Sequence, residues 1–185
     1  MNLLWIKTQN QCPALSRSQS TRVAESCEHR LVAQCGFLAV NSITVAPDRF
    51  ACAVVSAATG DLASFVEKVV ATQPWLATDL YESVGDTRIS EVKTALKARS
   101  PISKIAEVKA PILITHGGKD QQSPLSDAEA YAAALHAGGK KVAFAVFPEE
   151  GHGVNSPDTK LVYYGIIENF LAACLGGKSE PGALT

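Results

Sequence analysis

The sequence lacks the features that mark membrane, nucleic-acid-binding and secreted proteins. Its 185 residues carry a formal net charge of −1, so there is no electrostatic reason to expect a nucleic acid or an anionic membrane as partner. Its apolar runs are far shorter than a membrane span. The opening residues, MNLLWIKTQNQC, have neither the basic start nor the sustained apolar core of a signal peptide. A cytoplasmic location is therefore expected by default.

Paired cysteine motifs are also missing. The five cysteines are Cys12, Cys27, Cys35, Cys52 and Cys174, an odd number whose spacings match neither a zinc site nor a CxxC redox pair. We therefore expect reduced thiols, some of them buried as small hydrophobic side chains. Neither a metal nor another cofactor is expected.

What is present is an ordinary globular composition, 46% hydrophobic and 19% charged, which suits one domain with one core. Residues 1–35 show no clean periodicity and are expected to be irregular, and 178–185 form a tail. Between them, at 36–177, the pattern predicts buried strands at 50–56, 110–117 and 141–147, and helices at 36–46, 61–71, 86–99, 126–139 and 158–177. Ser126 and Glu129 match a capping box for one of these helices. The alternation predicts an α/β fold, a parallel sheet flanked by helices.

Two loops at strand ends carry groups suited to acid–base chemistry. Asp120 follows the strand PILITHG, and His152 follows KVAFAVF in the segment PEEGHG. Ligands bind at the carboxyl ends of parallel strands, so the two side chains are expected to meet there. A carboxylate beside an imidazole holds the ring in one tautomer and stabilises its protonated form. The glycines at 151 and 153 are expected to let the loop turn tightly and to leave the ring exposed. His152 is then a candidate general base.

These segments resemble a known family. APILITHGGKDQQSP, the helix SDAEAYAAALHAGGKKV and FPEEGHG are similar to the carboxyl-terminal part of the catalytic domain of the prolyl oligopeptidase family, which includes dipeptidyl-peptidase and acylaminoacyl-peptidase-like enzymes. The resemblance covers residues 36–175. It implies a partial α/β-hydrolase fold with a serine–aspartate–histidine triad, in which Asp120 is the acid and His152 the base. The implied activity is hydrolysis of short peptides through an acyl-enzyme, without cofactor or metal.

The same resemblance places the nucleophile where this sequence has no serine. The family's elbow has glycine, any residue, serine, any residue, two glycines and an aromatic residue. Aligned on LVAQCGF, Gly36 and Phe37 match the last glycine and the aromatic, but Leu31, Ala33 and Cys35 stand at the first glycine, the serine and the second glycine. Alanine has no oxygen with which to attack, and the strained elbow needs small residues beside the nucleophile. As written, the triad lacks its nucleophile.

Several interpretations remain open. Cys35 is an alternative nucleophile, although using it would place Phe37 where a small residue is required. A non-catalytic hydrolase-like binding protein and an α/β-hydrolase esterase are alternative functions, since an acid and a base do not distinguish esters from amides. The segment at 72–85 is expected to border the substrate pocket, where either Trp75 or Tyr81 faces the substrate or both pack on the sheet.

The simplest hypothesis is that residues 1–35 come from a shifted reading frame or a misplaced start joined to a genuine hydrolase segment. The polypeptide is then a fragment that is inactive alone, and any true amino-terminal targeting signal would be lost. In such a fragment the strand at 50–56 lies at the edge of the sheet. An uncovered apolar edge favours self-association.

Overall fold

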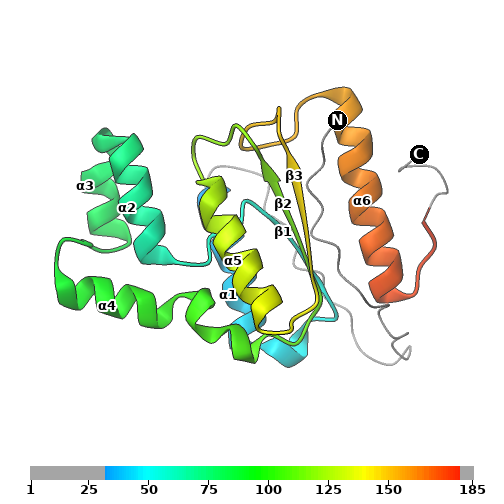
Figure 1. Cartoon of the computed structure of the whole chain (residues 1–185), viewed down its shortest axis with the longest axis horizontal. Coiled ribbons are helices and arrows are strands. Elements are labelled where there is room, and N and C mark those ends of the chain that lie inside the picture. The colour runs from blue at the N-terminus through cyan, green and yellow to red at the C-terminus, as the bar shows by residue number, and fades with distance from the viewer. Residues whose placement is uncertain (1–31, 180–185) are drawn as a thin grey trace.

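A computed structural model describes residues 32–179 of the chain (Figure 1). Its centre is a parallel sheet in the order β1-β2-β3, with β1 at Ala53–Ser56, β2 at Ile112–Gly117 and β3 at Val142–Phe147. The register pairs Ala53 with Ile112 and Ile112 with Val142. The predicted α/β fold with a parallel sheet flanked by helices is confirmed. The first strand is shorter than the expected 50–56, because regular pairing begins only at residue 53. The short 3-10 helix η1 (Pro47–Arg49) lies just before it.

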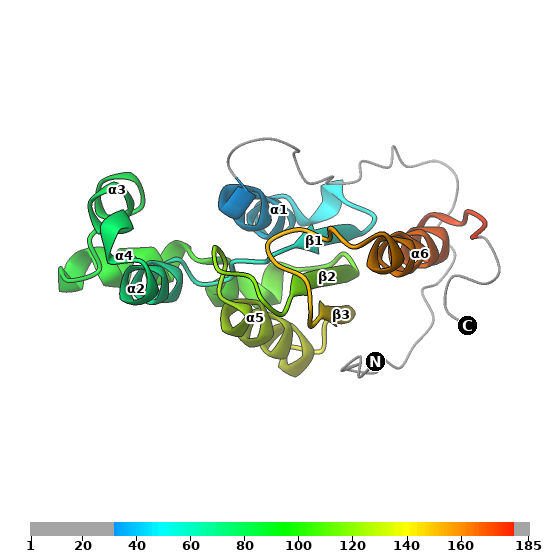
Figure 2. The ribbon, with the colours of Figure 1, turned by 90° about the horizontal axis from the view of Figure 1, so that it is seen from above.

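Helices cover both faces of this sheet, as the view from above shows (Figure 2). Helices α1 (Val32–Val45) and α5 (Leu125–Ala137) pack on one face, and α6 (Pro157–Leu175) packs on the other. The first face holds the larger core, to which α1 contributes Val40 and Ile43 and α5 contributes Tyr131 and Leu135. On the second face Ile166 of α6 meets side chains of β2 and β3. The bounds of α5 and α6 agree with the expected ones to within two residues, whereas α1 begins at Val32, before the expected start at 36. Left-handed Gly176 ends α6.

The connection from β1 to β2 forms a separate helical lobe beside the sheet (Figure 1). Asp61 begins it by accepting hydrogen bonds from the N–H groups of Ala63 (2.9 Å) and Ser64 (3.1 Å), the arrangement of a helix N-cap. Two small apolar clusters hold the lobe, and one of them includes Phe37 of α1. Its elements are α2 (Leu62–Thr72), η2 (Pro74–Leu76), α3 (Ala77–Ser83), α4 (Ser90–Arg99) and η3 (Pro101–Glu107).

The cysteine prediction is wrong for one pair. Cys52, just before β1, and Cys174, in the last turn of α6, form a disulfide with 6.3 Å between their Cα atoms. They are 122 positions apart in the sequence, so no local spacing could reveal the pair. Cys12 and Cys27 lie outside the described residues, and so does the side chain of Cys35.

The predicted capping box of α5 is also wrong. The helix begins at Leu125 after Pro124, so Ser126 lies within the first turn and does not cap it. The Ser126 hydroxyl instead accepts a hydrogen bond from Lys68 Nζ at 2.9 Å, and the same amine forms an ion pair with Asp127 at 2.6 Å. These groups join α5 to α2 and are used for packing. Across residues 32–179, no helix is both long and apolar enough to cross a membrane.

Candidate active site

The loop after β2 holds Asp120 in a fixed orientation. One carboxylate oxygen, Oδ1, accepts hydrogen bonds from the backbone N–H groups of Gln122 (2.8 Å) and Ser123 (2.9 Å). Burial by itself raises the pKa of this carboxyl, but the hydrogen bonds from His152 and from the two N–H groups outweigh it and lower the pKa below its ordinary value of 3.8. Asp120 is therefore an ionised acceptor at neutral pH.

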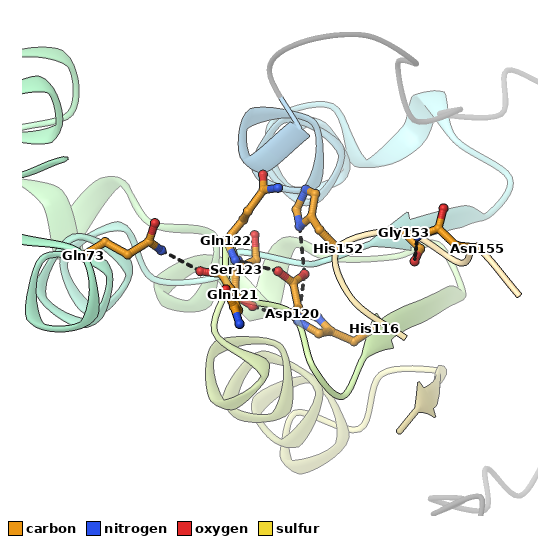
Figure 3. A network of polar contacts seen from close by, with 9 residues as sticks. All are labelled: Gln73, His116, Asp120, Gln121, Gln122, Ser123, His152, Gly153 and Asn155. Carbon is orange, nitrogen blue, oxygen red and sulfur yellow. Dashed lines mark hydrogen bonds and ion pairs between the residues drawn. The ribbon is translucent and has the colours of Figure 1, made fainter. Parts of the chain in front are cut away.

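The loop after β3 brings His152 to this carboxylate (Figure 3). The ring nitrogen Nδ1 lies 2.8 Å from Asp120 Oδ2. Because an ionised carboxylate can only accept, Nδ1 carries the proton, and Nε2 of the neutral ring has a free lone pair. Nε2 is buried, and it has no hydrogen-bond partner among the described residues. The side chain is 11% exposed, so the prediction that the loop leaves the ring exposed is wrong.

The loop after β2, here called the acid loop, and the loop after β3, called the base loop, are in close contact. This contact brings Asp120 and His152 together. A side chain on Gly117 would place its Cβ 1.9 Å from the carbonyl oxygen of Gly151, and one on Gly118 would approach the backbone of Pro148 at 2.7 Å. By contrast, Gly153 has open space around it, and neither Gly151 nor Gly153 has a positive φ. The prediction that Gly151 and Gly153 make the tight turn is therefore wrong: the essential glycines lie on the acid side.

The two carboxylates before His152 have different roles. Glu149 is exposed and pairs with Lys119 of the acid loop. Glu150 is buried, and its carboxylate accepts hydrogen bonds from the N–H groups of Asn155 (2.8 Å) and Ser156 (3.3 Å), which precede α6. The Asn155 N–H contributes most to lowering the pKa of Glu150 below 4.5. Glu150 thus closes the loop around His152. The sequence analysis missed this role, although the pattern EGH beside a helix start was visible.

An apolar cavity of about 750 Å³ lies beside the site, between α1, the helical lobe and the acid loop. Gln122, whose N–H binds Asp120, forms part of its wall. Within the predicted rim segment, Leu80, Ser83 and Val84 line the cavity. Trp75 and Tyr81 do not: Trp75 is 73% exposed, and Tyr81 lies under the guanidinium of Arg88 at 4.4 Å. Neither of them packs on the sheet.

The predicted nucleophile position lies at the start of α1. This helix begins at Val32, so Ala33 belongs to its first turn. Gly36 packs directly on the end of β1, where a Cβ would come within 2.2 Å of the carbonyl oxygen of Ala57. Within residues 32–179, no group of three or more His, Cys, Asp or Glu side chains is placed to hold a metal ion.

Comparisons with known proteins agree with this geometry. The model of the prolyl oligopeptidase family matches residues 35–178. The chain is 31% identical over 146 residues to dipeptidyl aminopeptidase BIII of Pseudoxanthomonas mexicana, which covers 79% of this chain and 21% of that protein. It is 33% identical over 131 residues to acylamino-acid-releasing enzyme 2 of Oryza sativa subsp. japonica, covering 67% and 17%.

Solved structures show the same fold. A puromycin-hydrolyzing peptidase of Mycobacterium tuberculosis aligns with a TM-score of 0.69 at 26% identity, over 78% of this chain and 21% of that one. The acylaminoacyl peptidase of Pyrococcus horikoshii aligns with a TM-score of 0.66 at 23% identity, over 80% and 24%. The chain spans about a fifth of the length of the curated relatives it matches. With the family model matching most of its length, this chain belongs to the prolyl oligopeptidase family of serine peptidases, with an α/β-hydrolase fold.

Proposed function

We propose that this chain carries the acid and the base of a serine peptidase active site that cleaves short peptides through an acyl-enzyme. His152 is the general base and acts through Nε2. Asp120 is its orienting partner: it keeps the proton on Nδ1 and stabilises the imidazolium that forms when Nε2 takes a proton. The same Nε2 then delivers that proton to the leaving amine.

One observation carries this proposal. The 2.8 Å contact between His152 Nδ1 and Asp120 Oδ2 leaves Nε2 as a basic nitrogen that is buried and has no partner among the described residues. A buried polar atom without a partner is costly in a folded protein, and a catalytic role is one reason for keeping it. The names of the relatives, which are peptidases and acylamino-acid-releasing enzymes, favour a peptide over a simple ester as substrate.

The adjoining cavity is the proposed site for a substrate side chain. Its walls include the apolar side chains of Phe37, Leu62, Phe65 and Leu80, which favour a hydrophobic group. Arg99 and Lys104 also line it, and their positive charges disfavour a cationic group. Gln122 belongs both to this cavity and to the loop that holds Asp120. A peptide whose side chain fills the cavity would therefore lie close to the acid–base pair.

The nucleophile is the part that this chain does not provide. Alanine at position 33, where the family motif has serine, has no hydroxyl, so we propose that the chain as given is inactive alone. A fluorophosphonate probe, which reacts with activated serines, should leave the chain unlabelled. The triple variant Leu31→Gly/Ala33→Ser/Cys35→Gly restores the motif and should gain labelling. Adding His152→Ala to that variant should abolish the gain.

Each result has a clear meaning. Labelling of the unaltered chain would overturn the inactive assignment, and peptide mass spectrometry would then identify the residue that reacts. A triple variant that folds but gains no label would count against position 33 as the nucleophile site. Sequencing the source DNA through codon 36 tests the proposed frame shift, because a serine elbow in another frame would show where the motif was lost.

A non-catalytic binding role is the second candidate, and the alanine at position 33 favours it. A protein of that kind would bind a peptide in the apolar cavity without cleaving it. Calorimetric titration with a short hydrophobic peptide distinguishes the two functions. Binding that survives His152→Ala while the restored triple variant stays inactive would support the binding role over the peptidase.

A further inference from the structure

A second histidine lies directly beneath the acid loop. His116, in β2, has a side chain that is 0% exposed. Its Nε2 lies 3.0 Å from the carbonyl oxygen of Ser123. Since a carbonyl only accepts, Nε2 carries the proton and donates it to this oxygen. The other nitrogen, Nδ1, is buried and has no partner among the described residues.

This hydrogen bond completes a closed arrangement around Asp120 (Figure 3). Ser123 donates its own N–H to Asp120 Oδ1 at 2.9 Å, while its carbonyl is held by His116. The Nε2 atom of His116 also lies 3.5 Å from Asp120 Oδ2, the oxygen that accepts the hydrogen bond from His152 Nδ1. His116 therefore contacts both the turn that binds one carboxylate oxygen and the oxygen that binds the base.

We propose that His116 is a positioning residue of this site, a neutral donor that fixes the turn at Ser123 and so directs the Asp120 carboxylate toward His152. This inference rests on the proposed function for the role of Asp120. His116 is not among the residues that line the cavity, and its hydrogen bond is to the Ser123 carbonyl, so it acts through Asp120 and not on the substrate.

The surroundings of His116 favour its neutral form. Burial lowers the pKa of the ring below 6.5, and a positive charge on His152 would act in the same direction. The Ser123 carbonyl and the carboxylates of Asp120 and Glu129 act in the opposite direction without cancelling the shift. A second proton would have to sit on the buried Nδ1, which has no acceptor among the described residues. A neutral ring leaves the charge of Asp120 available to His152 alone.

Two substitutions distinguish the hydrogen bond of His116 from the packing of its ring. His116→Phe keeps a ring in the core but removes the donor. His116→Gln keeps a donor close to the position of Nε2. The matched control is His136→Phe, because His136 is exposed at the end of α5, away from the acid loop. All variants are compared in the full chain labelled with ¹³C and ¹⁵N.

Three NMR quantities report on the site: the pH titration of the Asp120 carboxyl carbon, the signal of the His152 Nδ1 proton, and the hydrogen exchange of the Gln122 and Ser123 amides. With His116→Phe we expect a higher pKa of Asp120 and loss of the Nδ1 proton signal. The two amides should exchange roughly tenfold faster, the equivalent of about one hydrogen bond. His116→Gln should restore most of all three quantities, and His136→Phe should change none.

The outcomes separate this inference from the proposed function. If the unaltered chain shows no hydrogen-bonded Nδ1 proton on His152, the proposed function fails. If that proton is present and His116→Phe changes none of the three quantities, the inference about His116 is overturned. If His116→Phe does not fold, His116→Gln is compared with the shorter His116→Asn. If only His116→Gln keeps the three NMR quantities of the unaltered chain, the inference is supported. If His116→Gln and His116→Asn behave alike, it is overturned.

Discussion

In the proposed active site, the acid–base half (Asp120 and His152) and the nucleophile half (the start of α1) lie at the same edge of the sheet, but they differ in what they supply. In the acid–base half, Asp120 has donors for both carboxylate oxygens and His152 is held between packed loops. In the nucleophile half, Gly36 packs tightly on β1 as the motif requires, yet Ala33 supplies no hydroxyl. Packing of the helix on the strand and possession of the reactive atom are thus separate properties. In the proposed assignment, the first is present without the second.

The largest loss of stability is expected from inserting a methyl group between the acid and base loops. In Gly117→Ala the new Cβ would meet the Gly151 carbonyl oxygen at 1.9 Å, and backbone on both sides leaves little freedom to move. Overpacking of this kind costs about 3 kcal/mol of unfolding free energy. Urea denaturation measures it, and the His152 Nδ1 proton signal should be lost with it.

Gly153→Ala is the matched control, since no atom lies within 4 Å of the position that its added methyl group would occupy and its φ is not positive. It should change the stability by less than about 0.5 kcal/mol. Equal effects of the two substitutions would show that loop flexibility, and not close contact, matters here.

The corresponding substitution in the nucleophile half is Gly36→Ala, with a smaller expected effect. Its Cβ would lie 2.2 Å from the Ala57 carbonyl oxygen. Replacing glycine by alanine inside a helix gains about 1 kcal/mol, which offsets part of the clash and leaves a net loss of about 2 kcal/mol. Chemical denaturation provides the value. A variant more stable than the parent would mean that α1 does not pack closely on β1, and the two halves would then differ in packing as well as chemistry.

The sequence was sufficient to place the acid–base pair. Buried apolar runs marked β2 and β3, and parallel strands bring their carboxyl ends to one edge, so Asp120 and His152 could be expected to meet. Both side chains follow their strands within a few residues. The position of each residue just after its strand was therefore enough to predict that the two side chains lie close together.

Contacts between distant residues were beyond the sequence. The partner of Cys52 is 122 positions away, and the glycines that matter, Gly117 and Gly118, are defined by the backbone of another loop. The pattern at Ser126 suggested a cap, but Pro124 starts the helix earlier and the hydroxyl binds Lys68 of α2. For the disulfide and for the two glycines, the deciding atom belongs to an element far along the chain.

The next effect comes from the charge of Asp120. Asp120→Asn keeps an oxygen for the N–H groups of Gln122 and Ser123 but presents an amide to His152, which then keeps its proton on Nε2. We expect a loss of about 1 kcal/mol and a change of tautomer visible in the ¹⁵N shifts of His152.

The pH dependence has a definite sign. The folded-state pKa of Asp120 is lowered, so its stabilisation is present above the ordinary value of 3.8 and is lost as the pH falls through the lower folded value. In Asp120→Asn, the unfolding free energy should no longer show this loss at low pH. Unchanged acid unfolding would show that the carboxylate does not depend on its partners.

The smallest effect is expected from the base loop, where Glu150→Gln and Glu149→Gln form a natural pair. Glu150 is buried and holds the N–H groups of Asn155 and Ser156, whereas Glu149 is 81% exposed. A glutamine at 150 offers one oxygen and turns a donor toward the other N–H. Asn155 and Ser156 should therefore exchange their amide hydrogens faster, while Glu149→Gln leaves them unchanged.

The same pair tests the origin of the acid sensitivity. The folded-state pKa of Glu150 is lowered, chiefly by the Asn155 N–H, so its stabilisation also fades as the pH falls below the ordinary value of 4.5. Glu150→Gln should flatten this part of the acid limb, and the exchange of Ser123 in the acid loop should stay the same. If both loops loosened together, they would form one cooperative unit, in which Glu150 also supports the acid loop through the close contact at Gly117. If only the base loop loosened, Asp120 and His152 would each have a separate support: His116 for Asp120 and Glu150 for His152.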